Sequence, residues 1–134
     1  AEMSVGAVKG VEIGDGFEAA KAVGSVNNDD FCRNADGTIG KRTNHSGGIL
    51  GGMSDGSPVV LRAAFKPTPS ISRPQQTVNR AGEEVETVIK GRHDPIIVPR
   101  AVVVVETMAA FTAADLMLQN AVAKLDNVRK VYER

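Results

Sequence analysis

The stretch GGILGGMSDGSPVVLRAAFKPTPS, residues 47–70, decides how the chain is expected to fold. Two Gly-Gly pairs flank only two apolar residues, so the backbone there can adopt positive φ and approach a ligand closely. Apolar residues then alternate along residues 59–65, and this period of two predicts a strand. The strand ends before Pro67, because proline cannot donate a ladder hydrogen bond and disfavours the helical conformation at Lys66.

Lys66 is therefore expected where the strand ends. The hydroxyls of Thr68 and Ser70 follow it, and ammonium and hydroxyl groups both donate hydrogen bonds to phosphate oxygens. An anion-binding turn would have this composition. A solvated turn would have it too, because Lys, Pro, Thr and Ser are common turn residues. The spacing leaves both interpretations open.

Length and composition predict a single domain, residues 1–134, large enough to bury a sizeable core. Sixteen Lys and Arg balance sixteen Asp and Glu, which argues against nucleic acid or an anionic membrane as a partner and leaves a small charged ligand compatible. The single Cys32 cannot form an internal disulfide, so we expect a reducing compartment, the cytoplasm.

No leader sequence opens the chain, and Glu106 and Asp115 break its longest apolar tract, residues 101–118. We therefore expect neither a signal peptide nor a membrane-spanning helix. The chain does not begin with Met, and we expect it to be part of a longer one.

The remaining pattern predicts one further strand, two hairpins and a long helix. A strand is expected over residues 4–13, a hairpin with its tip at Asp36-Gly37, and a second hairpin around residues 80–83. A mostly buried helix is expected from Pro99 to about residue 123, followed by a second helical segment over residues 126–134.

Two histidines and several aspartates are candidate site residues. No D-x-D-x-D-G frame with a distal Glu occurs, so we predict no metal site. His45 is expected to be a hydrogen-bonded loop histidine. In residues 91–95, GRHDP, three ionisable side chains precede an apolar segment, so Asp94 either belongs to a site or caps a turn that Pro95 continues.

Five motifs together resemble chorismate synthase. In order along the chain they are VKGVEIGDGF (8–17), NHSGGILGGMSDG (44–56), AFKPTPSI (64–71), GRHDP (91–95) and VPRAVVVVETM (98–108). The resemblance extends over residues 3–122 and concerns the C-terminal portion of the family's chains. The N-terminal portion, which in the family supplies two catalytic histidines and most substrate-binding arginines, is not present in this sequence.

The resemblance implies a reduced-FMN-dependent lyase that converts 5-enolpyruvylshikimate 3-phosphate to chorismate and phosphate. This 1,4-elimination without net redox change is the last step of the shikimate pathway, which leads to aromatic amino acids. The resemblance also implies a homotetramer, an association with NADP, and an α+β fold, a β-α-β sandwich whose antiparallel sheets pack on a long buried helix, here residues 99–123.

The resemblance assigns roles to individual residues. The aspartate matching Asp94 lies by the flavin ring and assists proton movement. Flavin contacts are implied for Gly6, Ala7, Gly51, Lys66, Pro67, Thr68, Pro69, Ser70 and Arg92. We expect the 134-residue chain alone to be inactive. The alternative is a non-catalytic folded fragment with a latent flavin- or phosphate-binding face.

Overall fold

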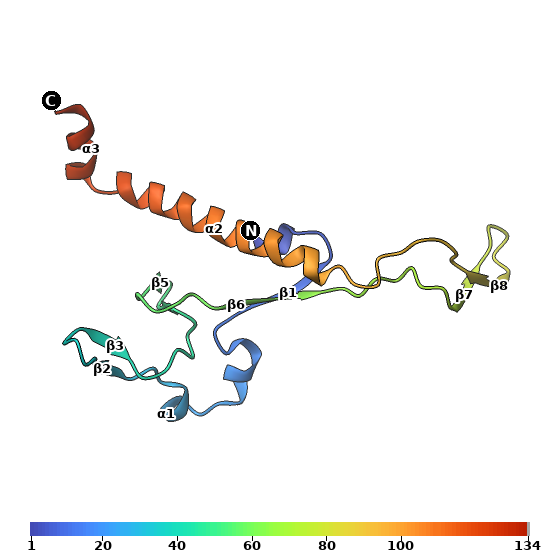
Figure 1. The fold of residues 1–134 in the computed structure, drawn as a ribbon, viewed down its shortest axis with the longest axis horizontal. Coiled ribbons are helices and arrows are strands. Elements are labelled where there is room, and N and C mark those ends of the chain that lie inside the picture. Colours follow the sequence, from blue (N-terminus) through green and yellow to red (C-terminus); the bar gives the residue numbers. More distant parts are fainter. Residues whose placement is uncertain (134) are drawn as a thin grey trace. The chain divides into compact units, whose positions relative to one another are not determined.

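The computed structural model describes residues 1–133 (Figure 1). The chain divides into two units after residue 64. The first unit is Glu2–Ala64 and the second begins at Phe65. Both helices and small antiparallel sheets are present, which confirms the α+β class. The single domain expected from the chain's length stays a prediction.

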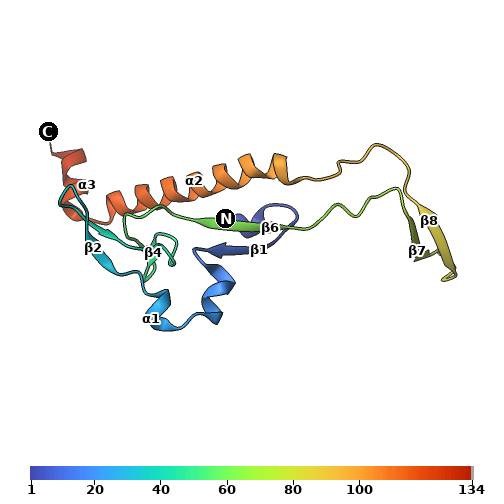
Figure 2. The same cartoon turned by 60° about the horizontal axis from the view of Figure 1, so that its bottom comes forward.

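The first unit consists of short elements connected by turns. Its strands form two-stranded sheets in which β1 lies beside β6, β2 beside β3, and β4 beside β5 (Figure 2). The elements are η1 (Glu2–Ser4), β1 (Val8–Ile13), η2 (Gly16–Lys21), α1 (Gly24–Asn27), β2 (Phe31–Arg33), β3 (Ile39–Lys41), β4 (Ile49–Leu50), β5 (Met53–Ser54) and β6 (Leu61–Phe65), whose last residue opens the second unit.

The two predicted strands of this unit are present with narrower bounds. Alternation over residues 59–65 corresponds to β6, which ends one residue before Lys66 as predicted. The strand expected over residues 4–13 begins only at Val8, because Ala7 has a φ of 68°. A residue in this left-handed conformation cannot continue a β-strand.

Both predicted hairpins are confirmed. In the first, β2 and β3 pair in the register Cys32↔Gly40, and Gly37 has a φ of 87° at the turn. In the second, β7 (Pro74–Val78) and β8 (Glu84–Val88) pair with Val78 opposite Glu84. Positive φ at the turn residues explains why glycine stands at both tips.

The long helix is present, but the prediction that it is buried is wrong for this chain. It is α2 (Val98–Val122), with Pro99 in its first turn as predicted, and the second helical segment is α3 (Leu125–Tyr132). Only Ala101 of α2 is buried. A helix that is apolar on all sides needs cover on all sides, and the described part of its unit offers only α3 and the β7–β8 hairpin.

The expected core is missing as well. Val8 and Ala101 are the only buried apolar residues among residues 1–133. By length and composition α2 could cross a membrane, although the core helix of a soluble protein meets the same criteria. The expectation that the chain has no membrane-spanning helix therefore stays a prediction.

Candidate functional site

The glycine-rich bend of residues 47–56 folds into a miniature hairpin. β4 and β5 pair with Leu50 opposite Met53, and the turn between them consists of Gly51 and Gly52, with φ of 59° and 80°. A type I′ turn, which joins the two strands of a hairpin through a two-residue loop, requires positive φ at both of its central residues. A Cβ atom added at Gly51 would meet no atom within 4 Å. At the tip of this glycine hairpin, residues 49–54, Gly51 and Gly52 therefore border open space that a ligand can approach.

The base of the glycine hairpin is, in contrast, tightly packed. A Cβ on Gly14 would lie 2.0 Å from the carbonyl oxygen of His45, and one on Gly47 would lie 2.3 Å from the amide nitrogen of Gly14. A Cβ on Gly48 would lie 2.6 Å from the carbonyl oxygen of Pro58. These glycines let three backbone segments meet, so the base is fixed while the tip stays open.

A buried ion cluster lies beside this base. It consists of Asp29, Lys41 and Asp55, whose side chains are only 4%, 4% and 11% exposed. The Lys41 ammonium lies 3.8 Å from Asp29 Oδ2, donates a hydrogen bond to Ser46 Oγ at 3.3 Å, and forms an ion pair with Asp55. One cation is thus shared by two carboxylates inside the first unit.

Asp29 accepts hydrogen bonds from the loop that leads into the glycine hairpin. Burial raises its pKa, but hydrogen bonds from Ser46, Thr43 and His45 outweigh burial, and the pKa of Asp29 lies well below its ordinary value. The donors are the backbone amides of His45 (2.8 Å) and Ser46 (2.9 Å) and the hydroxyls of Ser46 (2.7 Å) and Thr43 (2.7 Å).

The other carboxylate of the cluster is ionised for a different reason. A hydrogen bond from Lys41 lowers the pKa of Asp55, and the backbone amide of Ser57 lowers it further. No sequence pattern indicates this cluster, because its three members are separated by 12 and 14 residues and match no motif.

His45 is a hydrogen-bonded loop histidine, as predicted. Its Nδ1 lies 2.6 Å from Asp15 Oδ2, and both side chains are partly exposed. Asp15 also donates its backbone amide to the carbonyl oxygen of His45, at 2.8 Å. The pair connects the turn after β1 to the loop before the glycine hairpin.

Ala7, one of the predicted flavin contacts, has an unusual backbone. Its φ of 68° is the only positive value at a non-glycine position among residues 1–133. The left-handed conformation costs an L-residue roughly 1–2 kcal/mol. Strain of this kind is concentrated at ligand-binding positions. Gly6 beside it is open, since a Cβ there would meet nothing within 4 Å.

The second unit holds the remaining predicted residues. Lys66 and Arg92 are exposed and form no hydrogen bond or ion pair with any residue that the structure describes. In the same two segments Thr68 Oγ1 and His93 Nε2 are buried without a hydrogen-bond partner. Buried polar groups are nearly always satisfied, so two orphaned atoms beside two unpaired cations need an explanation.

Asp94 does not cap the helix that follows it. The residue before α2 is Ile97, and no side chain caps its amides. Instead Asp94 Oδ2 accepts a hydrogen bond from Arg100 Nη1 at 2.7 Å, and the Asp94 side chain is 41% exposed. The alternative interpretation of Asp94, a turn cap continued by Pro95, is thus not realised at α2.

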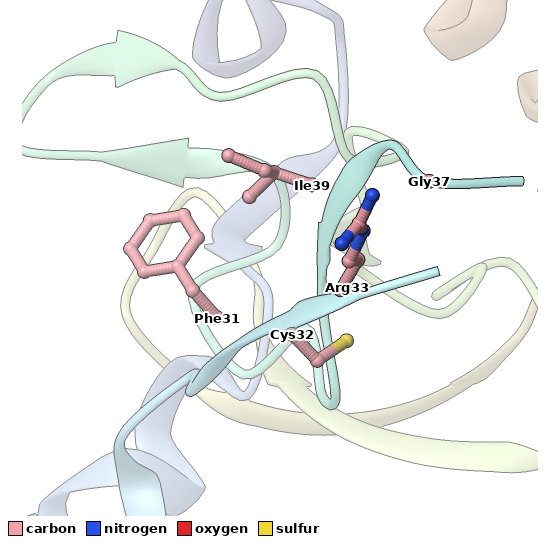
Figure 3. Close-up of a pocket in the computed structure, with 5 residues that line it drawn as sticks. All are labelled: Phe31, Cys32, Arg33, Gly37 and Ile39. Atoms are coloured by element: carbon pink, nitrogen blue, oxygen red, sulfur yellow. The ribbon is translucent and has the colours of Figure 1, made fainter. Parts of the chain in front are cut away.

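An open hollow of about 450 Å³ lies elsewhere, on the β2–β3 hairpin (Figure 3). Phe31 and Ile39 extend to the same side of the hairpin, while the Cys32 thiol points away from them. Arg33 and Gly37 complete its lining. It contains no predicted site residue, and we assign it no function.

The family model of chorismate synthase matches residues 1–118. The chain belongs to the chorismate synthase family. The matched residues include every predicted site residue from Gly6 to Asp94 and end within α2.

Named relatives agree with this assignment. The chorismate synthases of Lachnoclostridium phytofermentans and Agathobacter rectalis are each 64% identical to this chain, over 131 and 132 residues, which is 98% of this chain and 36% of each relative. That of Methanocaldococcus jannaschii is 57% identical over 118 residues, 87% of this chain and 31% of its own. The chain thus spans about a third of the length of the curated relatives it matches.

One solved structure is similar as well. A crystal structure of a chorismate synthase matches 49% of this chain and 20% of its own, with 44% sequence identity and a TM-score of 0.47. The predicted flavin contacts fall in both units of the present structure, Gly6, Ala7 and Gly51 in the first and residues 66–70 and Arg92 in the second. Their individual roles stay predictions.

Proposed function

We propose that this chain contributes the FMN-binding part of a chorismate synthase. The complete enzyme, meaning this chain together with the N-terminal portion that the family resemblance implies, would convert 5-enolpyruvylshikimate 3-phosphate to chorismate and phosphate. The observation that carries the proposal is the match of the family to residues 1–118, which contain all the predicted cofactor contacts. Membership of the family also implies the shikimate pathway.

The donor groups of the second unit fit a flavin phosphate. Lys66 and Arg92 are cations without a partner among residues 1–133, and ammonium and guanidinium groups pair well with phosphate oxygens. Thr68 Oγ1 is a buried hydroxyl without a partner, and an oxygen of the cofactor would satisfy it. We infer that residues 66–70 and Arg92 bind FMN.

The first unit would contribute backbone peptide groups to cofactor binding. A Cβ atom added at Gly51 would meet no atom within 4 Å, so a planar ring can approach the peptide groups there. Gly6 is open in the same way, and the strained Ala7 beside it holds one fixed backbone conformation. These residues would orient the cofactor.

Asp94 would hold and move a proton. Arg100 occupies Oδ2 at 2.7 Å, while Oδ1 accepts no hydrogen bond from the described residues. A positioned carboxylate with one free oxygen can act as a general acid or base. Reduced FMN, when bound, would supply reducing chemistry and return to its starting oxidation state, because the overall reaction has no net redox change.

The complete enzyme would also provide what this chain lacks. We propose that its fold is a β-α-β sandwich in which α2 is covered, because α2 is apolar on all sides and only Ala101 of it is buried here. A cytoplasmic homotetramer and an association with NADP belong to the same proposal. The two catalytic histidines and most substrate-binding arginines would come from the N-terminal portion.

A second candidate function is a folded fragment with a latent flavin- or phosphate-binding face and no activity. The cations Lys66 and Arg92, unpaired among residues 1–133, favour such a phosphate-binding face, while the near absence of buried apolar residues there leaves the chain alone little core to hold it. Titration with FMN, of the chain alone and of the complete enzyme, distinguishes the two. We expect tight binding and chorismate formation by the complete enzyme only. If the complete enzyme bound no FMN, the proposed function would be wrong.

A further inference from the structure

We propose that the buried ion cluster of Asp29, Lys41 and Asp55 is the positioning element that holds the glycine hairpin ready for the cofactor. The proposal rests on the proposed function, because it assumes that Gly51 contacts FMN. The three residues do not touch the cofactor themselves; they act through the backbone of the loop.

The cluster holds the glycine hairpin at both of its ends. On the incoming side, where the chain enters the hairpin, Asp29 accepts hydrogen bonds from the backbone amides of His45 and Ser46. These two residues immediately precede the first Gly-Gly pair. On the outgoing side, Asp55 follows β5 directly and donates its backbone amide to the carbonyl oxygen of Gly48 at 3.1 Å. Lys41 connects the two sides through its contacts with Asp29 and Asp55.

A second contact reinforces the incoming side. Asn44 Oδ1 accepts the amide of Gly48 at 2.7 Å, and Asn44 Nδ2 donates to the carbonyl oxygen of Pro58 at 2.9 Å. The hairpin between these anchors contains only two residue pairs, Ile49 with Ser54 and Leu50 with Met53. An isolated hairpin of this size is marginal in water, so its position depends on the anchors.

Apolar packing does not provide an alternative anchor. Val8 is the only buried apolar residue of the first unit. The Asp29 and Lys41 side chains, each 4% exposed, are in contrast almost fully enclosed. Polar contacts with fixed geometry therefore determine where the glycine hairpin lies.

Lys41 is the most sensitive member, because it is shared. Removal of its ammonium leaves two enclosed carboxylates without their cation, and breaking a buried pair from one side is strongly destabilising locally. Asp29 would keep its hydrogen bonds from the incoming side, whereas Asp55 would lose its charged partner. We therefore expect the outgoing end of the glycine hairpin to detach first.

The test uses the complete enzyme and two matched pairs of variants. Lys41→Met is compared with Lys21→Met, whose ammonium forms an exposed ion pair with Glu18 at 2.7 Å. Asp29→Asn is compared with Asp36→Asn, another aspartate whose hydrogen bonds lower its pKa, at the tip of the β2–β3 hairpin. For each protein the dissociation constant of FMN and kcat at saturating FMN are measured.

We expect Lys41→Met and Asp29→Asn to weaken FMN binding by about tenfold or more, with kcat at saturating FMN within about twofold of the wild type. The two control variants should bind FMN like the wild type. A purely structural role would instead lower kcat through a smaller active fraction and leave the dissociation constant unchanged. That result, or unchanged FMN binding in both cluster variants, would overturn the proposal.

If the proposed function itself is wrong, the experiment gives a different result, because the wild-type enzyme would then bind no FMN. If Lys41→Met does not fold, Asp55→Asn provides the milder test, since the Asp55 side chain is the most exposed of the three. Hydrogen exchange of apo Asp55→Asn should accelerate within residues 44–56 and leave β1 protected. Equal acceleration throughout the first unit would contradict a positioning role.

Discussion

The glycine at the tip of the hairpin provides the sharpest test of the proposed cofactor contact, because the chain contains a matched control for it. Gly51 has a φ of 59° and Gly82, at the β7–β8 turn, has a φ of 84°. A Cβ atom at either position would meet nothing within 4 Å. The Cβ atom of a valine at either position therefore clashes with no described atom. The valine backbone, however, is forced into the left-handed conformation.

The magnitude follows from this geometry. Each of Gly51→Val and Gly82→Val should lower the free energy of unfolding by about 2 kcal/mol, because a branched L-residue is strained at positive φ. Only Gly51→Val places three carbon atoms in the space that the proposed flavin contact requires. Overpacking costs about 1–3 kcal/mol, which corresponds to FMN binding weakened by about 5- to 150-fold.

The assay is a titration of the complete enzyme with FMN, together with denaturant unfolding of the apo protein. We expect the two variants to be destabilised equally and only Gly51→Val to bind FMN more weakly. Equal FMN affinity in the two variants would refute the contact at Gly51. It would leave this glycine with a conformational role alone.

Three further predictions concern charged groups. Lys66→Ala and Arg92→Ala should each weaken FMN binding about tenfold or more in the complete enzyme, since a charge-assisted hydrogen bond contributes roughly 1.5–3 kcal/mol; unchanged titrations of both variants would remove these residues from the site. Asp94→Asn should keep FMN and substrate binding but slow turnover by about 10²- to 10⁴-fold in steady-state assays, and a turnover close to wild type would leave Asp94 with only its ion pair to Arg100. Folding lowers the pKa of Asp29. The contribution of Asp29 to stability is therefore fully present above its ordinary pKa of 3.8 and is lost as the pH falls below that value. Hydrogen exchange within residues 44–56 should therefore show no loss of protection from pH 7 to about pH 5, and a loss in that range would contradict the hydrogen bonds to Asp29.

Local structure could be predicted wherever a single residue type, glycine or proline, determines the backbone conformation. Asp36-Gly37 and residues 80–83 indicated both hairpins, because positive φ at a turn selects glycine. Pro99 indicated the start of the long helix to within one residue. Lys66 was correctly placed one residue beyond its strand, since Pro67 cannot continue a ladder.

Tertiary features could not be predicted in the same way. The apolar pattern of α2 indicates a buried helix, yet burial depends on partners that the described residues do not provide. The contacts among Asp29, Lys41 and Asp55 arise from the path of the chain, and sequence periodicity does not encode them. The left-handed Ala7 was also missed, because alanine has no preference for positive φ.

The central claim is that this chain supplies the cofactor site of an enzyme whose other catalytic groups lie outside it. The most direct measurement is chorismate formation from 5-enolpyruvylshikimate 3-phosphate with reduced FMN under anaerobic conditions. The complete enzyme and the 134-residue chain alone are compared at equal concentration. We predict turnover by the complete enzyme that depends on FMN, and none by the chain alone at any FMN concentration. Chorismate produced by the chain alone would contradict the account and make His45 and His93 the first residues to test.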